Sequence, residues 1–473
     1  MEARAAIPPT LPCPNPTTSY WQETPDAIAD LRSTVDLPKT VDVAIIGSGI
    51  TGAGIAYDLL SRDASSKILM LEARQACSGA TGRNGGHTKA ASYRTFAINA
   101  EALGLEEAAK IARFEYQTIK SIHAFARQHD IDCDLFSGDT VDIIYDQASW
   151  DEGVRTIEKM RASMPNDLEG AARYIIHGAT EAHDKYYCKG QSPIGVIRYE
   201  AGSLSAYKFV IGMLKLCLAK GLNLQTNTPA TGLEKTANGS WLVKSSRGPV
   251  SAKSIVVATN GYTGFILEKM RGVIVPLRGQ ITAHRPGSNM PRDGLATTYS
   301  FIYANGYEYM ISRPQGTSYA GDIVIGGGLV KAPREGLYEY GTTDDTSIDP
   351  TVSQYLTATT PTYFGSQWGD DHVAGRIRKE WTGIMGYSPD GFPFIGQMPG
   401  EKGLYISASF QGHGMVLCFL CAKALVHLMM GEDGKELDTW FPRAFRITEE
   451  RTKLTFRGRK LSKPHDLEIK VRT

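Results

Sequence analysis

Three glycines near the start of the chain have the spacing of a turn that binds a dinucleotide. Gly47, Gly49 and Gly52 stand in "DVAIIGSGITGAGIAYDLL", where an apolar run precedes the glycines and an apolar helical pattern follows them. The first glycine permits the tight turn, the second lets the backbone approach a pyrophosphate, and the third lets helix and strand pack closely. The helix N-terminus then offers unpaired N–H groups to an anion. The pattern therefore predicts a dinucleotide site rather than a chance glycine-rich loop.

An acidic residue narrows the choice of dinucleotide. Glu72 lies about 20 residues after Gly52, at the end of a second apolar run, "SKILMLEA". A carboxylate at this place accepts hydrogen bonds from the ribose hydroxyls of the adenosine and repels the 2′-phosphate of NADP. NAD and FAD remain open at this point.

Two later segments favour a flavin. Residues 254–262, "SIVVATNGY", read either as a strand that returns beside the dinucleotide fold or as an ordinary buried strand. Residues 407–429, "SASFQGHGMVLCFLCAKALVHLM", end a strand on glycines and begin a helix at about Met415. A helix N-terminus aimed at a ligand suits the edge of a flavin ring that becomes negative on reduction.

With these segments the chain resembles the D-amino-acid-oxidase-like FAD-dependent oxidoreductases. Within that family it is most similar to the branch that contains γ-glutamylputrescine oxidoreductase and the glycine and sarcosine oxidases. The likeness extends over roughly residues 38–435 and is carried by four blocks: "DVAIIGSGITGAGIAYDL", "CSGATGRNGGHTKA", "VVATNGYT" and "EWTGIMGYSPDGFPFIGQMPGEKGLYISASFQGHGM". The resemblance implies FAD as the cofactor.

The resemblance also implies which residues bind the cofactor. The glycine turn is expected at the pyrophosphate, Glu72 at the ribose, residues 78–86 around the ring and pyrophosphate, and the late glycines at the ring. The expected cofactor-binding residues are Gly47, Gly49, Ile50, Thr51, Gly52, Glu72, Ala73, Arg74, Ser78, Thr81, Arg83, Asn84, Gly85, Gly86, Ala230, Gly261, Gly383, Gly412, His413, Gly414 and Met415.

The resemblance implies a reaction in which flavin N5 accepts hydride from the carbon that bears an amine, after which the imine hydrolyses. The amine must be neutral for transfer, so the pocket should disfavour an ammonium. Arg313, in "YEYMISRPQG", matches the position that holds a substrate carboxylate in glycine-oxidase-like relatives. An arginine at a strand end is equally well explained as a surface residue.

Several aromatic and polar residues have two interpretations each. Tyr309, with Tyr303 and Tyr307, either forms a pocket wall or packs within a strand. Trp381 lies either near the ring or in the core. His413 is interpreted as a cofactor contact rather than a catalytic base. Asp390, in "SPDGFP", is expected to orient its loop through an Asx-type turn. No catalytic residue is assigned beyond the candidates Arg313, Tyr309, Trp381 and His413.

Two departures from related enzymes bear on the chemistry. The stretch "EWTGIMGYSPD" has no cysteine, and Arg83 stands near the place of a linking histidine, so FAD is expected to be non-covalent. The strand "DIVIGGG" has no lysine, although Lys331 follows it. We expect oxygen as the electron acceptor of an amine or amino-acid oxidase. The alternatives are a flavin dehydrogenase or oxidative cyclase of a specialised metabolite, and a non-catalytic dinucleotide-binding protein.

The composition of the chain argues against other functional classes of protein. The 473 residues carry 51 basic and 50 acidic side chains, a net charge of +1 that argues against a nucleic-acid partner. Seven scattered cysteines suggest reduced thiols, and the pair Cys418 and Cys421 is expected to pack in a helix rather than to bind metal. We expect no metal site, signal peptide or membrane span, and a cytoplasmic protein whose partners are a small amine and its electron acceptor.

The expected architecture is α/β: a Rossmann-like FAD-binding domain and a second, β-rich substrate domain, as in D-amino-acid-oxidase-like and glutathione-reductase-like flavoproteins. At this length two joined domains are the default. A long amphipathic helix is expected over 105–130, residues 331–375 read as loose, and "WTGIMGYSPDGFPFIG" reads as turn-rich. The segments assigned are 1–38 as an N-terminal arm, 39–132, 196–284 and 376–440 as the FAD-binding domain, 133–195 and 285–375 as the substrate domain, and 441–473 as a C-terminal extension.

Overall fold

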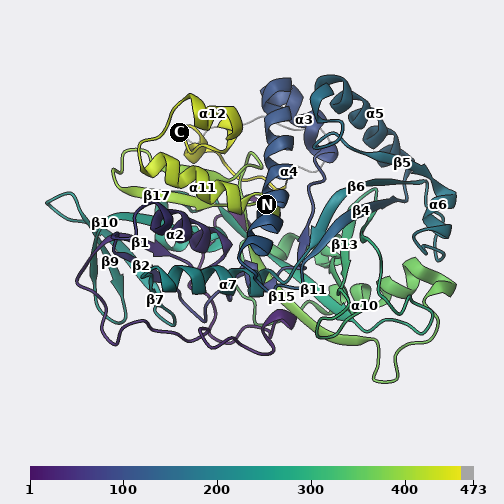
Figure 1. Cartoon of the computed structure of the whole chain (residues 1–473), viewed down its shortest axis with the longest axis horizontal. Coiled ribbons are helices and arrows are strands. Elements are labelled where there is room, and N and C mark those ends of the chain that lie inside the picture. Colours follow the sequence, from purple (N-terminus) through teal and green to yellow (C-terminus); the bar gives the residue numbers. More distant parts are fainter. Residues whose placement is uncertain (460–473) are drawn as a thin grey trace.

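The computed structural model describes residues 1–459 and contains two β-sheets that lie side by side (Figure 1). The eight-stranded sheet consists of β1 (Thr40–Ile46), β2 (Ile68–Leu71), β7 (Asn223–Gln225), β8 (Ala230–Lys235), β9 (Trp241–Ser245), β10 (Val250–Val257), β16 (Phe394–Gln397) and β17 (Leu404–Ala408). Its order is β16-β17-β10-β1-β2-β7, and the hairpin of β8 and β9 joins β10. The central strand β1 is parallel to β10 and to β2, as in a Rossmann-like fold.

The helix α2 (Ile50–Arg62) connects β1 to β2 and confirms the predicted strand, turn and helix order. It packs against α7 (Ala206–Ala219) and α11 (Cys418–Met429). A Cβ atom at Gly54 would stand 3.0 Å from Ala422 Cβ, so this glycine lets α2 and α11 approach closely. Cys418 and Cys421 are both buried on α11, and all seven cysteines of the chain are free thiols.

The nine-stranded sheet has the order β15-β11-β14-β13-β12-β4-β6-β3, with β5 paired to β6. All its pairs are antiparallel except β12 with β4. Its strands are β3 (His87–Thr88), β4 (Phe136–Ile144), β5 (Ile175–Gly178), β6 (Gly195–Ser203), β11 (Val275–His284), β12 (Thr298–Tyr303), β13 (Gly306–Ser312), β14 (Ile323–Gly327) and β15 (Ile377–Tyr387). This sheet is the second, β-rich layer expected from the sequence.

The remaining helices surround the two sheets (Figure 1). The longest, over residues 105–128, is the predicted amphipathic helix, and it packs against α11. These helices are α1 (Glu2–Ala5), α3 (Tyr93–Leu103), α4 (Leu105–Gln128), α5 (Gln147–Ser163), α6 (Ala179–Asp184), α8 (Thr263–Ile266), α9 (Pro333–Gly336), α10 (Pro350–Phe364) and α12 (Lys435–Trp440).

Three sequence-based expectations differ from the structure. Strands β11 and β15 pair with each other in the nine-stranded sheet, although the segments 196–284 and 376–440 were assigned to the FAD-binding domain. The first part of the turn-rich motif is the long strand β15, because its "EWTGIMGY" pairs along its whole length with β11. Residues 331–375 contain the helix α10. Its many threonines and Pro361 are unfavourable for a helix, so the sequence pattern did not indicate one.

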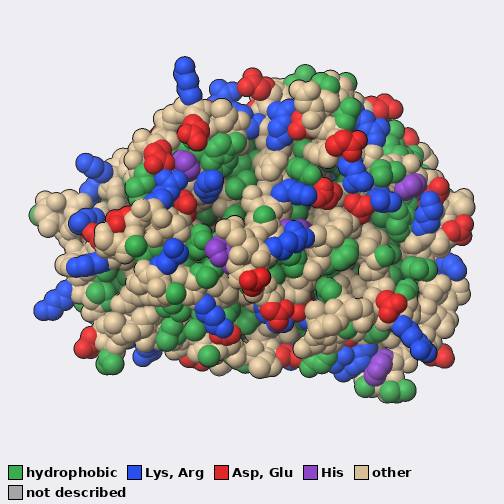
Figure 2. Space-filling view, viewed as in Figure 1, with side chains coloured by type: hydrophobic (Ala, Val, Ile, Leu, Met, Phe, Trp, Pro, Cys, Tyr) green, Lys and Arg blue, Asp and Glu red, His purple; other side chains and the backbone are tan. Residues whose placement is uncertain are grey.

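Buried residues of both sheets belong to one large apolar cluster. It includes Ile45 of β1 and Leu425 of α11 together with Ile281 and Trp381 of the second sheet. On the face in Figure 2 acidic and basic side chains are interspersed, in keeping with the near-zero net charge. No helix within residues 1–459 combines the length and apolarity needed to cross a membrane.

Candidate active site

A cavity of about 850 Å³ runs between the two sheets. One end is lined by the glycine turn at Gly47 and Gly49, and the other by Gly412, Gly414 and Met415. Its volume is at the upper end of the range for small-molecule sites. The two glycine-rich segments, more than 360 residues apart in the chain, therefore face one and the same space.

The glycine turn has the geometry that its spacing predicts. Gly47 has a φ of +108°, and its N–H donates to Leu71 O at 2.8 Å. A Cβ atom at Gly52 would stand 2.0 Å from Gly47 O, so the turn and the first turn of α2 admit no side chain there. The N-cap residue Gly49 has no side chain, and the N–H of Ile50 donates to the Thr81 hydroxyl at 3.1 Å. Gly49, Ile50 and Thr51 line the cavity. An anion at this helix N-terminus would meet backbone N–H groups and the positive end of the helix dipole.

Glu72 is held in place where the ribose acid was expected. Its Oε2 accepts hydrogen bonds from the N–H and the hydroxyl of Ser48, at 3.0 and 2.7 Å, and its Oε1 accepts from the N–H of Arg74 at 3.0 Å. The side chain lines the cavity with only 9% of the residue exposed. This arrangement fixes the carboxylate on the cavity wall, as recognition of ribose hydroxyls requires.

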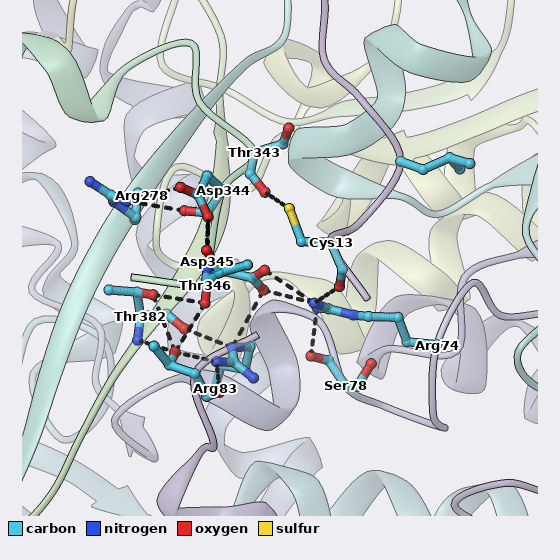
Figure 3. A network of polar contacts seen from close by, with 12 residues as sticks. Cys13, Arg74, Ser78, Arg83, Arg278, Thr343, Asp344, Asp345, Thr346 and Thr382 are labelled. Carbon is cyan, nitrogen blue, oxygen red and sulfur yellow. Dashed lines mark hydrogen bonds and ion pairs between the residues drawn. The ribbon is translucent and has the colours of Figure 1, made fainter. Parts of the chain in front are cut away.

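Next to Glu72 a buried ion cluster joins three distant segments (Figure 3). Asp345 is fully buried, 3.0 Å from Arg74 Nη1 and 3.7 Å from Arg83 Nε. Arg74 also donates to Cys13 O at 3.0 Å, and Arg83 donates to the hydroxyl of Thr17 at 2.7 Å. The cluster thereby fastens the N-terminal arm and the loop around Asp345 to the residues that follow β2.

The cluster carries an excess positive charge toward the cavity, because two guanidinium groups share one carboxylate. Both Arg74 and Arg83 line the cavity. Burial and the charge of Arg74 lower the pKa of Arg83 to about 10, while Asp345 opposes this shift. Arg83 is still protonated at neutral pH, and a phosphate group at this wall would balance its charge.

Beside the ion cluster, Gly383 of β15 lies against Arg83. A Cβ atom at Gly383 would stand 3.1 Å from Arg83 Cβ, and Gly383 lines the cavity. Trp381 does not line the cavity: it is fully buried, and its Nε1 donates to Arg83 O at 2.7 Å. Of the two interpretations of Trp381, the structure shows the core position.

His413 lies beside the cavity rather than in its lining. Its N–H donates to Phe410 O at 2.7 Å, and its neighbours Gly412 and Gly414 do line the cavity. Desolvation by the surrounding protein and the positive charges of nearby residues lower the pKa of His413 to about 4, although solvent still reaches this residue. An imidazole with this pKa is a weak proton acceptor, which agrees with the interpretation against a catalytic base.

Aromatic side chains form one wall of the cavity. Tyr303, Tyr307 and Tyr309 all line it, so the structure brings together the three tyrosines that the sequence singled out. Two cations accompany them: Arg94 lies over the Tyr307 ring, 4.7 Å from its centroid, and Lys331 lies over Tyr303 at 5.4 Å. Arg94 was missed from the sequence, where only its position shortly after the "GRNGGH" segment could have marked it.

The expectation for Arg313 is corrected. Arg313 does not line the cavity: its Nη1 is 3.0 Å from Asp134 Oδ2, and its Nη2 donates to Ser318 O at 3.0 Å. The rings of Tyr20 and Trp21, from the N-terminal arm, lie over its guanidinium carbon at 5.7 and 5.0 Å. Asp134 and the aromatic rings of the N-terminal arm thus contact the guanidinium group of Arg313, which was expected to bind a substrate carboxylate.

Most of the expected cofactor-binding residues line the one cavity. Those that do so are Gly47, Gly49, Ile50, Thr51, Glu72, Ala73, Arg74, Thr81, Arg83, Asn84, Ala230, Gly383, Gly412, Gly414 and Met415. Those that do not are Gly52, Ser78, Gly85, Gly86, Gly261 and His413.

The glycines outside the lining serve close packing beside it. A Cβ atom at Gly85 would stand 2.3 Å from the Tyr309 ring, and one at Gly261 would stand 2.3 Å from Met385 O. These glycines allow neighbouring segments to pack closely against residues that line the cavity. Within residues 1–459 no group of three or more metal-ligating side chains is gathered.

Comparison with known proteins agrees with this geometry. A family model described as FAD dependent oxidoreductase (DAO) matches residues 42–428. The γ-glutamylputrescine oxidoreductase of Escherichia coli K12 is 22% identical over 421 residues, which cover 88% of this chain and 89% of that protein.

Two solved structures show the same fold. Glycine oxidase from Geobacillus kaustophilus superposes with a TM-score of 0.68 at 17% identity, covering 87% of this chain and 99% of that chain. L-Proline dehydrogenase from P. horikoshii superposes with a TM-score of 0.66 at 18% identity, covering 86% and 98%. The fold is that of the two-domain flavoproteins, as the sequence predicted.

Proposed function

Because this chain belongs to the family of FAD-dependent oxidoreductases, in which FAD is the cofactor, we propose that it oxidises the C–N bond of an amine or amino acid. The observation that carries the proposal is the single cavity. Its lining includes the glycine turn at Gly49, the glycines Gly383 and Gly412, and a region walled by Tyr303, Tyr307 and Tyr309, here called the tyrosine lobe. A cofactor that extends from the first region to the second would leave this lobe for a small substrate.

Different residues along the cavity would bind different parts of FAD. Glu72 and the N-terminus of α2 would hold the adenosine and pyrophosphate, and Arg83 and Gly383 would border the ring. When bound, FAD supplies a two-electron acceptor for the C–N oxidation. The aromatic wall of Tyr307 and Tyr309 would limit the solvation of a bound amine and so favour its neutral form over its ammonium.

For the electron acceptor we propose molecular oxygen. Lys331 lines the cavity, and within residues 1–459 no carboxylate oxygen lies within 4.0 Å of its Nζ. Lys331 is exposed to solvent and lies over the Tyr303 and Tyr355 rings, where its cation would favour the negative charge that develops on oxygen as it is reduced. Lys331 lies just beyond β14, which itself carries no lysine.

We also propose that FAD is bound without a covalent link. Cys418 is the one cysteine in the cavity lining described, and that lining includes no histidine. Burial raises the pKa of the Cys418 thiol to about 12. A thiol with so little thiolate at neutral pH is a poor nucleophile toward a flavin. The seven free cysteines also favour a reducing compartment, and we extend the proposal to the cytoplasm.

The test begins with the purified protein. It should be yellow, and acid precipitation should release FAD into the supernatant. Under anaerobic conditions a panel of primary amines, secondary amines and amino acids should include a compound that bleaches the flavin absorbance. Protein that stays colourless after incubation with FAD, or a flavin that no member of the panel bleaches, would contradict the proposed function.

The same preparation separates an oxidase from a dehydrogenase. Admitting oxygen to the bleached enzyme should restore the absorbance within the time of a turnover and should release one peroxide per substrate. The Lys331→Met variant should reoxidise more slowly while it is bleached by substrate at an unchanged rate. Reoxidation only by an artificial acceptor such as a quinone would favour the dehydrogenase alternative.

A further inference from the structure

The N-terminal arm brings a segment to the cavity that none of the glycine-rich blocks contains. Residues 7–16 read "IPPTLPCPNP", and we call this segment the proline strap. Three of its residues, Thr10, Leu11 and Pro12, line the cavity. The strap precedes residue 42, where the match to the family model begins, so its place at the cavity is a feature that the family blocks do not predict.

The composition of the proline strap suits a segment that crosses a cavity. Proline has a fixed φ and no backbone N–H, so a proline-rich segment stays extended and has few donors that need a partner. It also has less conformational freedom to lose when it becomes ordered. Between α1 and Tyr20 the described chain forms neither helix nor strand. The strap is therefore positioned by its two ends and by its side chains.

The end of the strap that leads into the body of the protein is firmly fixed. The N–H of Thr17 donates to Asp345 O at 2.8 Å, and Arg83 donates to the hydroxyl of Thr17 at 2.7 Å. Two residues further on, the hydroxyl of Ser19 donates to Gly82 O at 2.7 Å, and Ser19 is buried. Arg83 itself lines the cavity, so this end of the strap is fastened directly beside it.

The other end of the strap is fastened to a different part of the cavity wall. Arg4 of α1 donates from Nε to Tyr340 O and from Nη2 to Tyr338 O, both at 2.7 Å. A Cβ atom at Gly341 would stand 2.0 Å from Arg4 O, so the two backbones are in direct contact. Tyr340 also lines the cavity. The proline strap thus spans two fixed points that both border the cavity.

Between these points the strap has few bonds to the rest of the protein. No backbone N–H of residues 8–16 donates to a backbone carbonyl of the described chain. The hydroxyls of Thr10 and Thr343 are 2.6 Å apart, and Arg74 donates to Cys13 O at 3.0 Å (Figure 3 shows the contacts of Cys13). A segment with so few bonds can open locally without disturbing either sheet.

The contacts of the strap place it at the adenosine end of the cavity. Arg74, which binds Cys13 O, also donates its N–H to Glu72 Oε1 at 3.0 Å, and Glu72 is the expected ribose acid. Pro9 is buried against α8, where a Cβ atom at Gly264 would stand 3.2 Å from Pro9 Cγ. Two other residues of α8 line the cavity. The strap therefore lies across the part of the cavity that is expected to hold the AMP half of FAD.

We propose that the proline strap is a cofactor-binding element: Leu11 and Pro12 cover the AMP half of FAD, and FAD dissociates only after the strap has opened. Both side chains are half-buried, so a ligand beneath them removes further apolar surface from water. The weakly bonded middle of the strap is the part that opens, while the contacts at Thr17 and Ser19 hold. The inference needs FAD as the cofactor and makes no use of the substrate.

A shortened protein tests the strap. A chain in which residues 2–16 are deleted keeps Thr17 and all later residues. The release of FAD from the diluted yellow protein, followed by flavin fluorescence, should be roughly 10- to 100-fold faster than in the full chain. Calorimetry on the apoprotein should show weaker binding of ADP, which carries the phosphate end alone, and unchanged binding of riboflavin, which carries the ring alone.

Two point variants within the strap assign the effect to the covering side chain. Leu11→Ala removes apolar contact with the cofactor, so FAD should leave roughly 3- to 10-fold faster than from the wild type. The matched control is Asn15→Ala, at an exposed position of the same strap outside the cavity lining, and it should release FAD at the wild-type rate. Equal release rates in the two variants would contradict the contact of Leu11 with FAD.

A disulfide that closes the strap gives the converse test. Because the hydroxyls of Thr10 and Thr343 are 2.6 Å apart, cysteines at these two positions can form a disulfide. Thr10→Cys and Thr343→Cys are combined with Cys13→Ser, which removes the neighbouring thiol. The oxidised form should release FAD at least about 10-fold more slowly than the reduced form of the same protein. This comparison carries the test if the shortened chain does not fold.

Three outcomes would overturn the role of the strap. They are unchanged FAD release from the folded shortened protein, equal release from the oxidised and reduced disulfide variant, and equal weakening of ADP and riboflavin binding by the deletion. None of these measurements involves turnover. A protein whose strap controls FAD release, but whose flavin no amine bleaches, would contradict the proposed function alone and leave the strap in place.

Discussion

Two acids, one fully buried and one half-buried, show how neighbouring groups decide the charge of a single residue. Asp345 is fully buried between Arg74 and Arg83, whose guanidinium groups lie 3.0 and 3.7 Å from its carboxylate and replace the solvent that it lost. Glu115, on α4, has only the hydroxyl of Ser92 as a donor to its Oε2. Burial raises the pKa of Glu115 to about 7. One hydroxyl does not compensate an ionised carboxylate, and the protonated form is favoured.

The raised pKa of Glu115 predicts that the free energy of unfolding depends on pH. The folded state binds this proton up to about pH 7, whereas the unfolded chain releases it near pH 4.5, so the free energy of unfolding falls as the pH rises between these values. Glu115→Gln removes the ionisation. The variant should be more stable than the wild type at pH 8, by roughly 1–3 kcal/mol, with the gain vanishing toward pH 4.5.

Chemical unfolding at pH 8 and at pH 5 measures this difference. Glu158→Gln, at an exposed position of α5, serves as the control and should leave the unfolding free energy unchanged at both values. An equal gain for Glu115→Gln at pH 5 and pH 8 would show that Glu115 is not protonated in the folded state.

At the scale of elements, the site depends on close approaches of backbone rather than on reactive side chains. The glycine turn brings β1, α2 and the strand end at Ala258 together, since a Cβ atom at Gly47 would stand 2.7 Å from Ala258 O. The loop after β17 turns at Gly412, with a φ of +74°. The strand β15 passes the cavity at Gly383. Each element exposes main chain to the cavity in which we propose that FAD binds.

The Gly52→Ala variant tests the turn. Its Cβ atom would meet Gly47 O at 2.0 Å, so the turn must open, at a cost of about 1–3 kcal/mol, and the N–H groups of α2 must move from their positions. We expect lower flavin content per protein and a lower melting temperature. The matched control is Gly434→Ala, outside the cavity lining, where a Cβ atom would also meet nothing within 4 Å. Equal flavin content in the two variants would contradict the role of the turn.

On the scale of the whole molecule, the cavity lies where the two sheets meet. Residues from β1, β11, β13 and β15 line it, together with Leu11 and Pro12 of the N-terminal arm. A ligand in this place contacts both sheets and the arm at once. Its binding energy is available only in the folded arrangement, so the cofactor should contribute to the stability of the entire fold.

Removal and return of FAD should therefore shift the melting temperature. The apoprotein should melt below the yellow protein, and each tenfold increase in free FAD above its dissociation constant should add about 1.4 kcal/mol of stability. Scanning calorimetry with increasing FAD measures the effect. Riboflavin and ADP, which present the ring and the phosphate end separately, should each stabilise less than FAD. A larger shift with NAD than with FAD would contradict the assignment of the cofactor.

The sequence alone determined the parts of this protein that are local. The turn at Gly47, the carboxylate of Glu72 and the helix over 105–128 follow from spacing and periodicity, because neighbouring residues decide them. Likewise, the glycines at 412 and 414 marked the second end of the site before any contact was known. The family and its cofactor follow from the same blocks.

Only the tertiary structure decided which arginine side chains pair with a carboxylate and which face the cavity. In the sequence Arg313 and Arg94 are alike, two arginines near aromatic residues; the fold gives Arg313 the carboxylate of Asp134 and the rings of Tyr20 and Trp21, and it leaves Arg94 facing the cavity over Tyr307. It also placed β11 and β15 in the second sheet. The physical reason is that ion pairing and strand pairing depend on distances between residues far apart in the chain, and spacing along the sequence does not specify those distances.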